Sequence, residues 1–128
     1  MRKPAPPGRA QFERFITDAV AALPREIRHR LNNVVIVLDD ASPPGRLLGR
    51  YHGVPNTDRT LFDSGVLPDK ITIFQRAIER EAATPGDLPP LVRRVVWHEI
   101  GHHFGFSERR IRQLERRWEQ RDRQAASR

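Results

Sequence analysis

The segment 98–103 (HEIGHH) constrains this chain most, because it holds two histidines four residues apart and a glutamate directly after the first. On an α-helix His98 and His102 lie one turn apart on the same face, so both imidazoles can bind one metal ion. Glu99 is rotated by about 100° and is long enough to reach a water on that ion. The motif therefore predicts a helix and a metal site, in which Glu99 accepts a proton from the water.

The residues around the motif indicate a core helix that ends in a sharp turn. Apolar residues recur before and within the motif and predict a helix from about Leu88 to Phe104. Gly105 can adopt the left-handed conformation that ends a helix and turns the chain back toward the metal. Glu108 follows three residues later, which extends the pattern to HExxHxxGxxE. We therefore expect Glu108 to be the third ligand.

The absence of cysteine narrows the choice of metal. Any ion must be held by His, Asp or Glu, and two imidazoles with one carboxylate suit zinc best among the common ions. A catalytic zinc site uses three protein ligands and keeps the fourth position for water. We expect one Zn²⁺ per chain, bound by His98, His102 and Glu108.

The N-terminal half predicts a helix followed by a strand. Helical apolar spacing runs from Arg9 to about Arg30, where Pro24 should end or kink the helix. A turn at Asn32 and Asn33 leads into the β-branched run 34–38, which is typical of a buried strand. The residues Asp39 and Asp40 after it fit turn chemistry better than a role in orienting a ligand histidine.

Two further strands and a final helix complete the prediction. Residues 46–52 form a plausible strand that carries and adjoins glycine, as edge strands often do, and residues 70–74 form a short third strand. Ser107 is a good N-cap for a last amphipathic helix. The fold class is therefore α+β: an N-terminal helix, a small sheet of three or four strands, the motif-bearing helix and a C-terminal helix.

The 128 residues suffice for one domain with a modest core. We expect a disordered, Pro-rich tail at 1–8, the domain at 9–122 and a flexible tail at 123–128, with a long ordered loop at 54–69. No apolar stretch is long enough to span a bilayer, and the start lacks the apolar segment of a secretory signal. The expected location is the cytoplasm, with no membrane contact.

The formal net charge is +7, and 21 of the 23 basic residues are arginine. Eight of these arginines lie between Arg109 and Arg128, where Glu115, Glu119 and Asp122 are interleaved with them. That pattern favours a solvated helix face over a phosphate-binding stripe. Because no nucleic-acid-binding motif accompanies it, we do not expect nucleic acid as a partner.

Three stretches carry a resemblance to a known family: LGRYHGVP at 48–55, LPDKITIF at 67–74 and HEIGHHFGFSE at 98–108. The last is similar to the metzincin pattern HExxHxxGxxH with a carboxylate as the third ligand. More closely, the chain resembles the small bacterial zincin-like metallopeptidases, sometimes called minimal zincins, over about residues 10–115. Two departures stand out: Glu108 occupies a position where Asp is commoner in the family, and no methionine follows Met1 to form a metzincin Met-turn.

The resemblance implies an α+β fold with the metal-bearing helix packed against a small sheet. It implies zinc ligands at His98, His102 and Glu108, with Glu99 as the general base. The implied activity is hydrolysis of peptide bonds in an extended peptide or protein substrate. We expect the substrate to lie along the edge of the predicted strand 46–52.

Several other residues are weaker candidates for the site. Tyr51 or His52 could polarise a substrate carbonyl, although both also fit ordinary strand positions. His103 is rotated away from the ligand face, so it suits packing or support of the site better than metal binding. Glu115 or Glu119 from the last helix are alternatives to Glu108 as third ligand.

Two other classes of function stay open from the sequence. One is a zinc-stabilised interaction domain without catalytic activity, which a closed set of four ligands would indicate. The other is a basic, nucleic-acid-associated protein that works through the arginine-rich last helix. The short chain after Glu108 also leaves little material for a deep specificity pocket.

Overall fold

The structure is a computed structural model that describes residues 8–53 and 68–126. The elements along the chain are α1 (Arg9–Ala21), α2 (Arg25–His29), β1 (Val34–Asp39), β2 (Gly49–His52), β3 (Asp69–Phe74), α3 (Gln75–Glu81), the 3₁₀ turn η2 (Pro85–Asp87), α4 (Leu88–His103) and α5 (Glu108–Ala126). Helices and one three-stranded sheet therefore form a small α+β domain, as the sequence predicts.

The sheet has the order β1-β3-β2, with β1 parallel and β2 antiparallel to β3. Its side chains alternate between the two faces. Ile71 and Ile73 of β3 are fully buried on one face, whereas Lys70 points to the other and is exposed. Gly49 and Tyr51 pair with Ile73 and Ile71, which places them on the buried face.

Strand β1 does not occupy the buried position that its β-branched run predicts. It lies at one edge of the sheet, and the side chain of Val35 is 43% exposed. The central strand is β3, because it pairs with β1 along one edge and with β2 along the other. An edge strand of a sheet with one covered face buries only alternate residues, and in β1 Leu38 is the residue that is buried.

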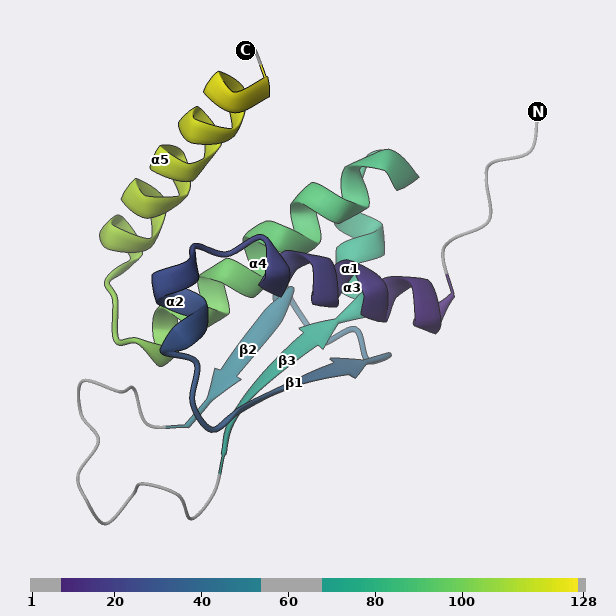
Figure 1. The fold of residues 1–128 in the computed structure, drawn as a ribbon. Coiled ribbons are helices and arrows are strands. Elements are labelled where there is room, and N and C mark those ends of the chain that lie inside the picture. The colour runs from purple at the N-terminus through teal and green to yellow at the C-terminus, as the bar shows by residue number, and fades with distance from the viewer. Residues whose placement is uncertain (1–7, 54–67, 127–128) are drawn as a thin grey trace.

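Two helices cover the buried face of the sheet (Figure 1). Helix α1 packs against α4, and α4 contacts β2 and β3. The fully buried centre of the core consists of Phe12, Ile71, Ile73, Ile78, Val92, Val96 and Ile100. The apolar spacing of α4 thus fixes its orientation, so that the opposite side, with His98 and His102, faces away from α1 and the core.

Local signals in the sequence explain where the helices begin and end. Pro24 separates α1 from α2, and Thr84 and Asp87 form a reciprocal capping box in η2 just before α4. Asp39 accepts a hydrogen bond from the Ala41 amide at 2.7 Å, which is the turn chemistry expected there.

The predicted tail at 1–8 and the predicted loop at 54–69 fall mainly on residues outside the described part of the chain. Helix α5 continues to Ala126, which lies inside the segment 123–128 for which a flexible tail is predicted. Its last described residues include Gln and Ala, which favour a helix, and no Gly or Pro ends it earlier. Within the described residues, no helix has the length and apolar character that crossing a membrane requires.

Candidate metal centre

A tight turn joins the motif helix to α5. The amide of Gly105 donates to the carbonyl of His102 and that of Phe106 to the carbonyl of Gly101, both at 2.9 Å. Gly105 has φ of +75°, so these bonds form a Schellman motif, which the glycine permits without strain. Ser107 then caps α5, since its hydroxyl accepts a bond from the Arg110 amide at 3.1 Å.

This turn brings Glu108 to the two motif histidines. His98 Nε2 lies 2.9 and 2.8 Å from the carboxylate oxygens of Glu108, and His102 Nε2 lies 3.2 Å from Oε1. The two imidazole rings have centroids 4.7 Å apart. Donor atoms bound to one tetrahedral zinc ion lie roughly 3.3 Å apart, because each bond is about 2.0–2.1 Å long. The distances of 2.8–3.2 Å between the Glu108 oxygens and the two imidazole nitrogens are close to that spacing.

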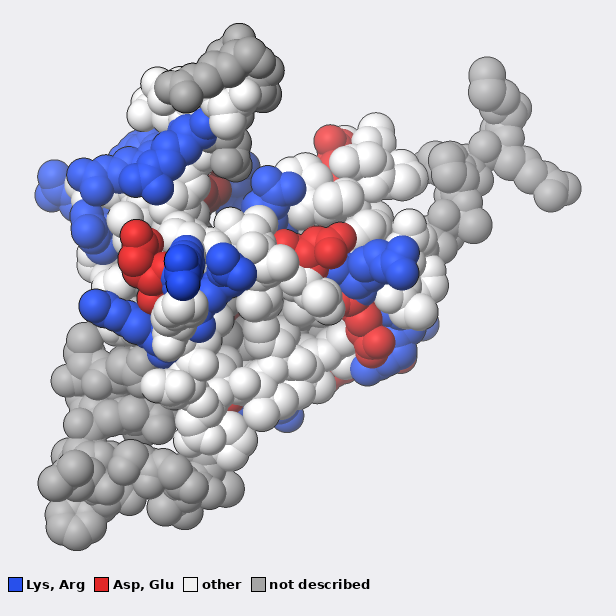
Figure 2. All heavy atoms as spheres, viewed as in Figure 1, with Lys and Arg blue, Asp and Glu red and all other residues white. Residues whose placement is uncertain are grey.

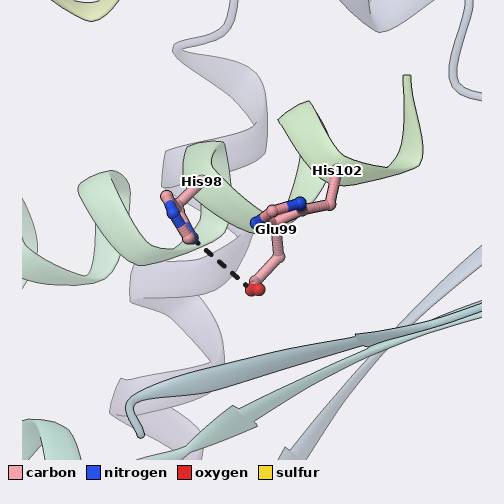
Figure 3. Close-up of side chains that lie close together, drawn as sticks. All are labelled: His98, Glu99 and His102. Atoms are coloured by element: carbon pink, nitrogen blue, oxygen red, sulfur yellow. Dashed lines mark ion pairs between the residues drawn. The ribbon is translucent and has the colours of Figure 1, made fainter. Parts of the chain in front are cut away.

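Glu99 lies beside the histidines and closer to the sheet (Figure 3). Its side chain is 7% exposed, and its Oε2 is 3.7 Å from Nδ1 of His98. The donor atoms of His98, Glu99 and His102 all lie within 4.8 Å of one another, a cluster that could hold a metal ion. Glu99 thus has a carboxylate at the site but projects from a different side of α4.

The carboxylates control the charge of the site. Glu99 and Glu108 raise the pKa of His98 from 6.5 to about 9, although partial burial opposes this effect. The hydrogen bond to His98 in turn lowers the pKa of the Glu108 carboxyl. The site thus stabilises a positive charge between carboxylates, which is the electrostatic environment that a divalent cation needs.

Helices α4 and α5 approach closely beside the histidines. A Cβ atom at Gly101 would overlap the side chain of Ile111, so only glycine permits this crossing. Ile111 is 1% exposed, and its carbonyl accepts a bond from Trp97 Nε1 at 2.9 Å. This contact holds the first turns of α5, and with them Glu108, over the motif.

A groove of about 810 Å³ runs along the site between β2, α4 and α5. Four of its lining residues are His98, Glu99, His102 and Glu108. The lining also includes Arg46, Leu47, Leu48, Gly49, Arg50, Tyr51, Leu91, Arg94, Val95, Ile111, Arg112 and Glu115. The wall of the groove formed by β2 is unusually close to α4. A Cβ at Gly49 would lie 2.9 Å from Val95 Cγ1 and 3.2 Å from Glu99 Cγ.

Tyr51 and His103 meet at a third residue, Asp69. His103 Nδ1 donates to Asp69 Oδ2 at 2.6 Å, and the Tyr51 hydroxyl donates to the same oxygen at 2.6 Å. The His103 side chain is 0% exposed and that of Asp69 is 4% exposed. One buried carboxylate thus links the end of α4 to β3 and β2, next to the ligand candidate His102.

The remaining sequence candidates lie farther from the histidines. His52 is exposed, and strand alternation places it on the sheet face opposite Gly49 and Tyr51, outside the described lining of the groove. Glu115 lines the groove but pairs with Arg94 at 3.0 Å. Glu119 is exposed farther along α5.

Sequence patterns do not single out Asp69 or Gly101, and they indicate Gly49 only as a glycine in an edge strand. Asp69 is 34 residues from His103, and no spacing rule connects them. Gly49 and Gly101 have no side chain, and this allows another segment to pack closely against each of them. Such a role can be recognised only when the facing segment is known. Two local signals exist: the glycine inside the predicted strand 46–52, and the glycine within the motif helix, where its cost in helix propensity can be explained by a packing role.

Comparison with known proteins adds an independent finding. A family model described as zincin-like metallopeptidase matches residues 31–118, which is more than half of the chain. The matched segment contains β1, β2, β3, α4 and the first half of α5. None of the curated proteins matches the chain.

Substitution Gly101→Ala tests the close crossing of the two helices. The added methyl group would push Ile111 and the start of α5 away, so zinc affinity should fall by about 10-fold to 100-fold. Competition with a chromophoric chelator measures this dissociation constant.

The double variant Gly101→Ala/Ile111→Ala should recover part of the affinity, because it removes the overlapping atoms. Gly86→Ala is the matched control, since its new Cβ would meet only Thr84 Oγ1 at 3.7 Å. Unchanged zinc affinity in Gly101→Ala would show that the crossing does not position Glu108.

Substitution Asp69→Ala tests the buried carboxylate. It removes the acceptor of both His103 and Tyr51, and we expect a loss of about 3–5 kcal/mol in the free energy of unfolding. Tyr51→Phe removes one bond to this carboxylate and should cost about 1.5–3 kcal/mol. Urea unfolding measures both values. His52→Gln on the exposed face is the control, and equal effects at Asp69 and His52 would refute the role of the link.

Proposed function

The chain belongs to the zincin-like metallopeptidase family, and on that premise we propose that it is a zinc-dependent peptidase that hydrolyses peptide bonds. The observation that carries the proposal is the convergence of His98, His102 and Glu108, with the carboxylate of Glu99 beside them in the groove. Zinc bound by these three side chains would lower the pKa of a water toward about 7 and polarise the substrate carbonyl.

In this proposal Glu99 is the general base. Its carboxylate accepts the proton of the attacking water and then delivers a proton to the leaving amine. Its burial against Gly49 restricts the side chain to few rotamers, which keeps the carboxylate near the reacting atoms. Burial also removes competing water from one side of the group.

The substrate would bind in an extended conformation along β2. In the described part of the chain, β2 pairs with β3 on one side only, so its other edge can pair with a peptide. The groove beside this edge has apolar walls from Leu47, Leu91 and Val95. The first half of α5 closes the opposite side through Ile111 and Glu115, so the chain after Glu108 does contribute to the groove.

Substitution Glu99→Gln tests the proposed chemistry. The amide cannot accept the proton, so hydrolysis of a fluorogenic peptide library should fall by about 10²–10⁴-fold while zinc content stays near that of the wild type. Glu119→Gln, which neutralises an exposed carboxyl outside the groove, should leave both values unchanged.

If Glu99→Gln hydrolyses the peptide library at the wild-type rate, Glu99 is not the general base. A zinc-loaded wild-type chain that cleaves no member of the library would instead identify a zinc-stabilised interaction domain.

A further inference from the structure

Helix α5 separates its side chains by type around its circumference. One side of α5 packs on the core and on α4, and it consists of Ile111, Leu114 and Trp118. The ring centroids of Trp118 and Trp97 are 4.3 Å apart. Glu108 and Glu115 lie on the neighbouring side, at the groove. The apolar and acidic residues thus have definite partners in the body of the domain.

About half of the circumference of α5 carries only arginine and glutamine. At about 100° per residue, one continuous half of the helix holds Arg109, Arg110, Arg112, Gln113, Arg116, Arg117, Gln120, Arg121, Arg123 and Gln124. All seven arginines in this set are exposed. Figure 2 shows basic atoms gathered over α5. We call this half of α5 the basic face.

The helix separates charges that alternate along the sequence. Glu115 and Glu119 stand among arginines in the chain, but they project about 90° or more from the middle of the basic face. Glu115 pairs instead with Arg94 of α4 at 3.0 Å. Within the described residues, no acidic group forms an ion pair with Arg110, Arg117 or Arg121. Their side chains are exposed, and no carboxylate among the described side chains offsets their charge.

We propose that the basic face of α5 binds the phosphate backbone of a nucleic-acid duplex. Guanidinium groups bind phosphate oxygens in a bidentate manner, and every basic group of this face is arginine. From Arg109 to Arg123 the face is about 21 Å long, and a duplex presents one charge per about 1.7 Å of its axis. Several arginines can thus contact phosphates at the same time.

The distribution of apolar residues favours a duplex over an anionic membrane. A helix that lies in a membrane surface needs an apolar side to insert between lipids. In α5 that side is already occupied, because Ile111 is buried and Trp118 packs on Trp97. The basic face itself contains no apolar residue.

Binding at the basic face is compatible with an open groove. The groove lies mainly on the acidic side of α5, where Glu108 and Glu115 are found, and Arg112 at the border of the basic face also lines it. Arg110, Arg117 and Arg121 are absent from its described lining. Duplex binding is thus separable from the proposed peptidase activity, and each can fail without the other.

The test is fluorescence anisotropy of a labelled 20-base-pair DNA duplex, and of an RNA duplex of the same sequence, titrated with the full chain at increasing salt. We expect the logarithm of the association constant to fall linearly with the logarithm of the salt concentration. The triple variant Arg110→Gln/Arg117→Gln/Arg121→Gln should weaken binding at least about tenfold and reduce the salt slope by about 2–3.

The matched control is Arg14→Gln/Arg25→Gln/Arg76→Gln, which removes the same charge from exposed positions on other helices. It should change the dissociation constant less than about threefold. Equal effects of both triple variants would overturn the proposal, because net charge alone would then explain binding. So would absence of duplex binding at 50 mM salt, or binding to phosphatidylserine vesicles in place of either duplex.

Discussion

The close crossing of α4 and α5 is the contact on which the candidate metal centre depends. Two candidate ligands lie on α4, but the third begins a different helix, so the carboxylate reaches them only if the helices meet at a fixed angle. The Schellman turn at Gly105 sets the direction of the chain, and the Ser107 cap sets the start of α5. The missing side chain at Gly101 then allows Ile111 to pack directly against α4.

A second close approach joins the motif helix to the sheet. Gly49 lets β2 lie against Val95 and Glu99, so the strand proposed to hold substrate and the proposed general base share one wall of the groove. Asp69 reinforces this arrangement from behind, because its carboxylate joins β3 to Tyr51 of β2 and to His103 of α4. Tight packing of this kind resists small displacements of the reacting groups.

Local sequence patterns predict much of this structure. Apolar spacing, Pro24, Gly105 and Ser107 correctly indicate where helices lie and end, since those signals act over a few residues. The same patterns place Glu108 three residues beyond the glycine, where the turn brings it to the histidines. They fail for β1, because whether a β-branched strand is central or at an edge depends on which other strand pairs with it.

The features that sequence patterns do not predict are mostly contacts between segments far apart in the sequence. The link between Asp69 and His103 depends on the placement of β3 beneath α4, which no periodicity specifies. Charge on α5 is a different case. The separation of arginine from glutamate follows directly from the helical period, but it is hidden when Arg109 to Arg123 is considered as a linear series.

The zinc content of the purified, untagged chain tests the central claim most directly. Elemental analysis should find about one zinc per chain in the wild type and much less in Glu108→Ala, because that variant removes the ligand that α5 contributes. A wild-type chain without zinc even after reconstitution, or a Glu108→Ala variant that keeps a full equivalent, would contradict the three-ligand site.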